Sequence, residues 1–163
     1  MSAGRGIRHE EYHEPGFAGV GGSMHMLQIW VNSPACEKTS APRYQLMQAG
    51  SIPAATLARA GGFVRVIAGS HAGVSGIATT ITPLSILDVT LHDGGAFSLD
   101  SDASHNLCAL VIGGSVRING ERTVERGNFV VFDHHGRTTT FVGQQSQTRL
   151  IVLCGAPLDG PLA

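Results

Sequence analysis

Short apolar runs separated by turn residues fill the chain from Gly61 onward. In residues 85–91, Leu87, Val89 and Leu91 alternate with Asp88 and Thr90, which is the period of a strand that buries one face. Turn signals recur roughly every eight to twelve residues, as in an all-β barrel or sandwich. The pattern predicts strands at residues 63–68, 76–81, 85–91, 96–99, 107–112, 116–118, 129–132, 138–142 and 149–153.

Glycine-containing pairs mark the turns between several of these runs. Gly113-Gly114 and Asn119-Gly120 are two-residue hairpin signals, and Arg126-Gly127-Asn128 is a third turn. Residues 61–163 show no sustained apolar period of 3.6 residues, so helices should be short and few. We therefore expect this part of the chain to form a β-barrel.

Residues 1–60 have a different pattern. Met26 to Val31 is nearly continuously apolar and is expected to be a buried strand. The glycine density of residues 14–22 favours a mobile connector. Residues 33–60, punctuated by Pro42 and Pro53, read mostly as connection.

His9 and Glu11 are the candidate metal ligands. Two residues apart in an extended segment, they lie on one face with Cα atoms roughly 6.5 Å apart, so their side chains can converge on one ion. An imidazole and a carboxylate are half of a non-haem iron site, which takes two histidines and a carboxylate. The alternative is a solvated surface pair. His13 on the same face is either a third ligand or a loop histidine, and His25 is expected to hydrogen bond at a strand end.

Several spaced blocks, taken together and in order, resemble the pirin family. They are Gly4-Arg5-Gly6-Ile7-x-His9-x-Glu11, Leu27-Gln28-Ile29-Trp30-Val31-Asn32, Glu37-Lys38, Pro42-x-Tyr44-Gln45, Ile52-Pro53, Val64-Arg65-Val66-Ile67-Ala68-Gly69 and Thr82-Pro83. The likeness is close from Gly4 to about Thr90 and looser from there to Leu158. Pirins are tandem cupin barrels with an iron-type site in the first barrel. The resemblance thus implies an all-β, cupin-type (jelly-roll) β-barrel, preceded by a strand and loop segment of another cupin barrel.

The resemblance also implies a division of the chain and an incomplete metal site. Residues 1–32 correspond to the end of the first barrel, 33–60 to the linker and 61–163 to the second barrel. His9 and Glu11 match two of the family's four ligands, while the other two form a His-x-His pair that this sequence lacks. In the second barrel, His105 with His134 or His135 could offer only two neutral ligands. We therefore expect that barrel to be metal-free, and Fe(II) to be possible only at His9 and Glu11.

Composition excludes several other classes. The net charge of −1 provides no basic field for direct nucleic-acid binding. The three cysteines (Cys36, Cys108 and Cys154) are widely spaced, which argues against a disulfide framework and suits a reducing cytosol. The longest apolar run, residues 107–112, is far below the ~20 residues of a membrane span. A cytoplasmic protein is the expectation.

Two functions remain open. The first, which we favour, is a non-catalytic pirin-like module that binds a protein or a small molecule, as the family's role in transcription co-regulation suggests. The second is an Fe(II)-dependent quercetin-type 2,3-dioxygenase whose missing histidines come from another chain. The apolar N-terminal segment predicts a homodimer, or association with a separately encoded first cupin half.

Overall fold

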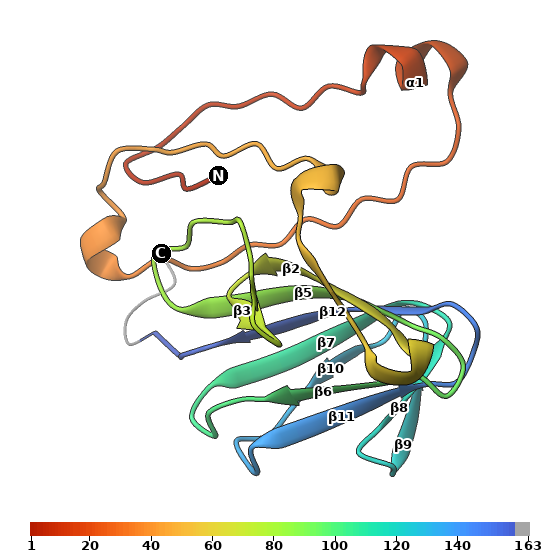
Figure 1. The fold of residues 1–163 in the computed structure, drawn as a ribbon. Helices are drawn as coiled ribbons and strands as arrows, with labels where there is room; N and C mark the ends of the chain where they lie inside the picture. Colours follow the sequence, from red (N-terminus) through yellow and green to blue (C-terminus); the bar gives the residue numbers. More distant parts are fainter. Residues whose placement is uncertain (159–163) are drawn as a thin grey trace. The chain divides into compact units, whose positions relative to one another are not determined.

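The computed structural model describes residues 1–158, which form two compact units. The first consists of residues 1–44 together with Leu158, and the second of residues 45–157. Figure 1 shows the second unit as two layers of antiparallel strands with a short hairpin beside them. The second unit therefore has the two-sheet jelly roll that the strand pattern and the resemblance predict.

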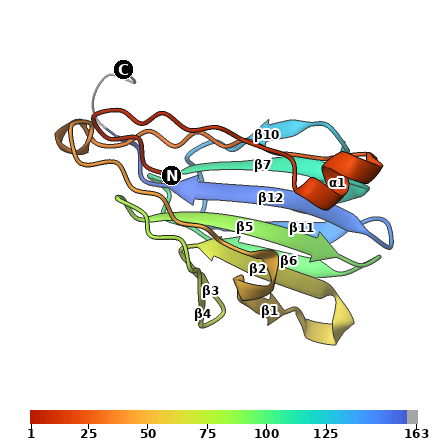
Figure 2. The ribbon, with the colours of Figure 1, turned by 90° about the horizontal axis from the view of Figure 1, so that it is seen from above.

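The elements of the second unit are mostly strands. Its 3-10 helices are η2 (Ala49–Ser51) and η3 (Ala58–Ala60), and its strands are β1 (Ala54–Thr56), β2 (Gly62–Ala68), β3 (Ser70–His71), β4 (Val74–Ser75), β5 (Leu84–Leu91), β6 (Ala96–Asp100), β7 (Asn106–Gly113), β8 (Ser115–Ile118), β9 (Arg122–Glu125), β10 (Phe129–Val131), β11 (Thr138–Gly143) and β12 (Thr148–Gly155). One sheet has the order β1-β2-β5-β12-β7-β10 and the other the order β6-β11-β8-β9, while β3 and β4 form a hairpin. Figure 2 shows β1 and β10 at opposite edges of the larger sheet.

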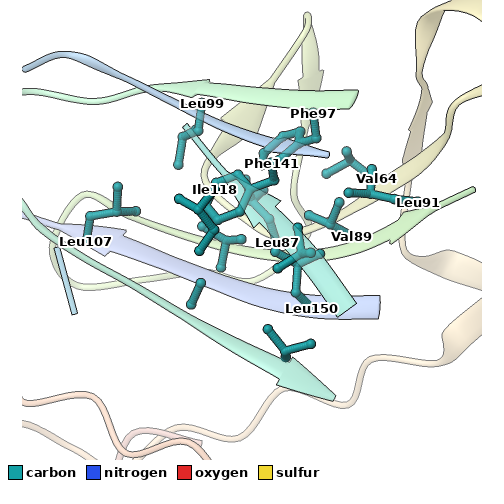
Figure 3. Packing of buried hydrophobic residues seen from close by; sticks show 14 of the residues in the cluster. Val64, Leu87, Val89, Leu91, Phe97, Leu99, Leu107, Ile118, Phe141 and Leu150 are labelled. Atoms are coloured by element: carbon teal, nitrogen blue, oxygen red, sulfur yellow. The ribbon is translucent and has the colours of Figure 1, made fainter. Parts of the chain in front are cut away.

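The core lies between the two sheets. It combines Leu87, Val89 and Leu150 of the larger sheet with Phe97 and Phe141 of the smaller one (Figure 3). The two phenylalanine rings stack with centroids 5.7 Å apart. The alternation read from residues 85–91 is confirmed, because Leu87, Val89 and Leu91 are all fully buried.

One predicted strand of the second unit is wrong. Residues 76–81 form none, although the run is rich in Thr and Ile. The side-chain amide of Gln45 takes the place of a neighbouring strand: its Nε2 donates to Ile77 O at 2.6 Å and its Oε1 accepts from Thr79 N at 2.9 Å. Ala78 N adds one bond to Ile67 O. Conversely, residues 33–60, which were expected to be a connection, contain a strand: β1 lies there and pairs with β2.

The predicted turns divide into two kinds. A hairpin at Asn119-Gly120 is confirmed between β8 and β9, with both residues at positive φ, but its loop also includes Glu121 because Ile118 pairs with Arg122. The hairpin predicted at Gly113-Gly114 is wrong, because β7 and β8 belong to different sheets and the glycines carry the chain from one to the other. A turn signal marks where the chain reverses and does not say which strands pair.

The first unit contains little regular structure. It has α1 (Pro15–Val20) and the 3-10 helix η1 (Ala35–Glu37), with an isolated bridge between Ser2 and Arg43. The mobile connector expected at residues 14–22 is therefore wrong in part. Pro15 begins a helix whose first N–H groups, at Gly16 and Phe17, donate to the Glu14 carboxylate.

The strands expected around His9 and at Met26 to Val31 are also wrong. Neither stretch is part of a strand or has a ladder partner among residues 1–158. Trp30 is 88% exposed and Met26 is 63% exposed, so the apolar run is not buried. A strand becomes stable by pairing within a sheet, and an apolar run alone does not specify that partner. The described chain has no helix with the length and apolar character needed to cross a membrane.

Candidate metal site

His9 and Glu11 lie side by side in the extended N-terminal segment. His9 Nδ1 is 3.9 Å from Glu11 Oε1, and the two side chains are 42% and 61% exposed. Two ligand atoms that each lie about 2.1 Å from one ion cannot be more than about 4.2 Å apart. The observed separation is compatible with a shared ion, and the assignment of both residues as ligands stays a prediction.

The neighbouring polar side chains have other partners. The Tyr12 hydroxyl donates a hydrogen bond to Glu10, and this bond raises the pKa of Tyr12. The N–H groups of Gly16 and Phe17 lower the pKa of Glu14. His13, weighed as a third ligand, packs against the Phe17 ring with centroids 5.7 Å apart.

The site does not reach the number of ligands that an iron centre requires. Residues 1–158 contain no group of three or more His, Cys, Asp and Glu side chains placed to hold one ion. Non-haem iron takes two histidines and a carboxylate. The side chains present therefore do not fit a complete centre, and they supply at most an imidazole and a carboxylate.

The interior of the second unit is occupied by apolar side chains. Phe97, Phe141 and Leu87 fill the space between the sheets (Figure 3). His71 packs edge-on against Phe97 at 5.0 Å, and burial lowers the pKa of His71. A neutral imidazole in contact with an aromatic ring is a packing group.

Two of the three histidines considered for a second site, His105 and His134, contact different groups. His105 Nδ1 lies 3.9 Å from Cys154 Sγ, and His134 Nε2 lies 3.1 Å from Asn106 Oδ1. The expectation of a metal-free second barrel stays a prediction. The contact between His105 and Cys154 was missed by sequence reasoning, because 49 residues separate the two.

Asp88 is the second feature that sequence reasoning missed. It lies on the sheet face opposite the core residues of β5, yet only 2% of the residue is exposed. Its Oδ1 accepts from Arg149 Nε at 2.9 Å, while its Oδ2 accepts from Arg149 Nη2 at 2.8 Å and from Arg65 Nε at 3.0 Å. Arg65 Nη2 also donates to Oδ2. The signal in the sequence was a carboxylate in the middle of an apolar strand, which requires a partner when buried.

The arginines decide the charge state of Asp88. Burial by itself raises the pKa of a carboxyl group, but here the hydrogen bonds and positive charges of Arg149 and Arg65 outweigh it, so the pKa of Asp88 is lowered. The pKa of Arg149 is raised by its hydrogen bonds to Asp88. The three side chains tie β2, β5 and β12 together across the larger sheet.

Comparisons with known proteins agree with this architecture. The family model described as the pirin C-terminal cupin domain matches residues 86–163. A Pseudomonas aeruginosa protein, provisionally named a quercetin 2,3-dioxygenase, is 35% identical over 162 residues, covering 99% of this chain and 56% of that protein. Pirin-1 of Arabidopsis thaliana is 30% identical over 166 residues, covering 99% and 55%. This chain thus spans little more than half the length of these relatives.

A solved structure gives the same result. The crystal structure of quercetin 2,3-dioxygenase from Acinetobacter baumannii superposes with a TM-score of 0.76 at 32% identity, covering 81% of this chain and 46% of that one. The two facing sheets and their apolar interior make the second unit a cupin domain. With the family match and the relatives added, the chain belongs to the pirin family.

Proposed function

We propose that these 163 residues act as a non-catalytic, pirin-type binding module that contributes two ligands, His9 and Glu11, to a divalent-metal centre. The observation that carries the proposal is the exposed pair itself, with ligand atoms 3.9 Å apart and no third ligand-type side chain grouped with them in residues 1–158. Two ligands hold an ion far less tightly, and with far less control of geometry, than a complete set does.

A protein partner is supported by an edge of the larger sheet. β10 is an edge strand on which Phe129 is 57% and Val131 73% exposed. An edge strand with exposed apolar side chains offers both free backbone groups and apolar surface to another chain. The apolar packing between the sheets leaves binding to the outside of the barrel.

The second candidate function is a quercetin-type dioxygenase with a completed centre. It is favoured by the 32% identity with the Acinetobacter baumannii enzyme and by the compatible spacing of His9 and Glu11. Two further histidines would have to be supplied by a second copy of this chain or by a separately encoded cupin half. Fe(II) is the metal expected for such a centre.

Oxygen consumption with quercetin separates the two candidates. The chain alone with Fe(II) should consume oxygen no faster than Fe(II) in buffer. Addition of the part of the Acinetobacter baumannii enzyme that lies outside the aligned region should leave that rate unchanged if the module is non-catalytic, whereas turnover that appears on this addition and is abolished by His9→Ala would establish the second candidate. Turnover by the chain alone that is lost in His9→Ala would overturn the non-catalytic proposal and establish the second one.

A further inference from the structure

Three segments distant in sequence meet at one end of the second unit. Cys154 lies at the end of β12, His105 directly precedes β7 and Ser101 directly follows β6. Antiparallel pairing of β12 with β7 sets Cys154 opposite Leu107, a core residue. The strand register therefore brings a thiol to within two residues of a histidine on the adjacent strand.

The side chains at this end are in contact. Cys154 Sγ is 3.9 Å from His105 Nδ1, within the range of a sulfur hydrogen bond, and the Ser101 side chain also hydrogen bonds the sulfur. Asp102 is close enough to His105 and Arg137 for their charges to lower its pKa, after the larger effect of its hydrogen bonds from Ser104. Cys154 packs against the apolar core and remains partly exposed.

An open pocket lies beside Ser101. Its volume is about 500 Å³, and it is lined by Asp100, Ser101, Asp102, Arg137 and Thr138. Ser101, the hydrogen-bond partner of the sulfur, also lines this pocket, so it lies between the pocket and the thiol; the lining itself includes neither Cys154 nor His105. Two aspartates and one arginine give the lining a net charge of −1, which disfavours an anionic ligand.

We propose that Cys154 and His105 form a nucleophile and base pair, a covalent modification site for small uncharged electrophiles of the α,β-unsaturated carbonyl class that approach from the side of Ser101. This site is separate from His9 and Glu11 and does not depend on the proposed function.

The reaction is an addition and needs no oxidant. The proton of the Cys154 thiol moves to His105 Nδ1 as Sγ forms a bond with the β carbon of the electrophile. The π pair of the alkene shifts toward the carbonyl and gives an enolate. The enolate then takes the proton back from the imidazolium at its α carbon.

Because burial keeps the Cys154 thiol protonated, its reaction needs a base that accepts the proton. Burial raises the pKa of Cys154, and the opposing effect of the Ser101 hydrogen bond is smaller, so the thiol is protonated at neutral pH. Cys108 provides the contrast within the same sheet: its pKa is also raised, by burial and then by the charge of Cys154. Sγ of Cys154 has an imidazole beside it.

The test is labelling with N-ethylmaleimide, an uncharged unsaturated imide, quantified for each cysteine by peptide mass spectrometry. At pH 7, Cys154 should react faster than Cys108, and His105→Asn should slow Cys154 by about tenfold or more. His134→Asn is the matched control, because His134 contacts Asn106, and it should leave the Cys154 rate unchanged. The exposed Cys36 is an internal standard in every sample.

Two further measurements separate a base from a structural effect. Added imidazole should restore labelling of Cys154 in His105→Ala and should not accelerate Cys36. With an anionic maleimide that carries a propionate group, the labelling rate of Cys154 should fall, relative to the neutral reagent, more than the labelling rate of Cys36 does. The proposal is overturned if Cys154 labels at the same rate in wild type and His105→Asn, or if imidazole fails to restore the rate in a folded His105→Ala protein.

Discussion

Replacement of Asp88 by asparagine is the sharpest test of how the larger sheet is held together. The carboxylate accepts four N–H donors from Arg65 and Arg149, while only 3% of its side chain is exposed. An amide has one acceptor oxygen, and its NH₂ group would face a guanidinium. Asp88→Asn therefore loses charge-assisted bonds and leaves two cations without their counter-charge.

The expected cost follows from the exposure of the three groups. Removal of one partner from a fully buried ion pair costs about 3–5 kcal/mol. Arg65 and Arg149 are 30% and 47% exposed, so water compensates part of the loss. We expect Asp88→Asn to lower the free energy of unfolding by about 2–4 kcal/mol, and the melting temperature by roughly 10 °C.

The pH dependence gives the same prediction an independent check. The pKa of Asp88 is lowered in the folded state, so its contribution is complete above the unfolded value of about 3.9. That contribution is lost as pH falls through the folded pKa. The difference between wild type and Asp88→Asn should therefore be large at pH 6 and should shrink below about pH 4.

Urea denaturation followed by far-ultraviolet circular dichroism measures both quantities. Asp133→Asn, an exposed carboxylate in a loop, is the control and should change stability by about 0.5 kcal/mol or less. The triple variant Arg65→Met, Asp88→Leu and Arg149→Met should cost less than Asp88→Asn alone, because no charge is left unpaired. A cost below about 0.5 kcal/mol for Asp88→Asn, or an equal cost at pH 3 and pH 6, would refute the reasoning.

Two further predictions concern backbone geometry and association. Gly62→Ala should destabilise the chain by more than about 3 kcal/mol, because its Cβ would lie 2.0 Å from Thr90 O at a φ of +129°. The control Gly73→Ala, with a φ of +79° and open space around it, should cost only about 1–2 kcal/mol. Equal losses of stability for the two variants in thermal melts would contradict this prediction. Light scattering at tens of micromolar should give a homodimer that dissociates in Trp30→Ser, since Trp30 is 88% exposed within one chain. A wild-type monomer whose Trp30 emits as in water would count against the dimer.

The sequence was most informative where a strand is defined by its own alternation. Leu87, Val89 and Leu91 carry the period of two residues, and β5 forms where that period predicts it. The apolar run at Met26 to Val31 was misleading. Apolar composition favours burial, but it does not specify which segment will pack against the run and bury it. In the same way, no local pattern predicts that the Gln45 side chain will hydrogen bond to the backbone of residues 77–79, where a neighbouring strand was expected.

The candidate sites also differ in whether their contacts are local in sequence or depend on strand pairing. His9 and Glu11 are two residues apart, so an extended backbone alone brings them together, and their spacing could be predicted. Asp88 meets Arg65 and Arg149 from 23 and 61 residues away, and Cys154 meets His105 only through the pairing of β12 with β7. Such contacts depend on sheet order and register, which a single sequence does not specify.

The metal affinity of the purified chain tests the central claim most directly. The account predicts that these residues retain no stoichiometric iron at micromolar Fe(II), and that His9→Ala and Glu11→Ala change nothing measurable at that concentration. One equivalent of tightly bound iron in the chain alone, removed by either substitution, would contradict it, because the pair would then belong to a complete centre.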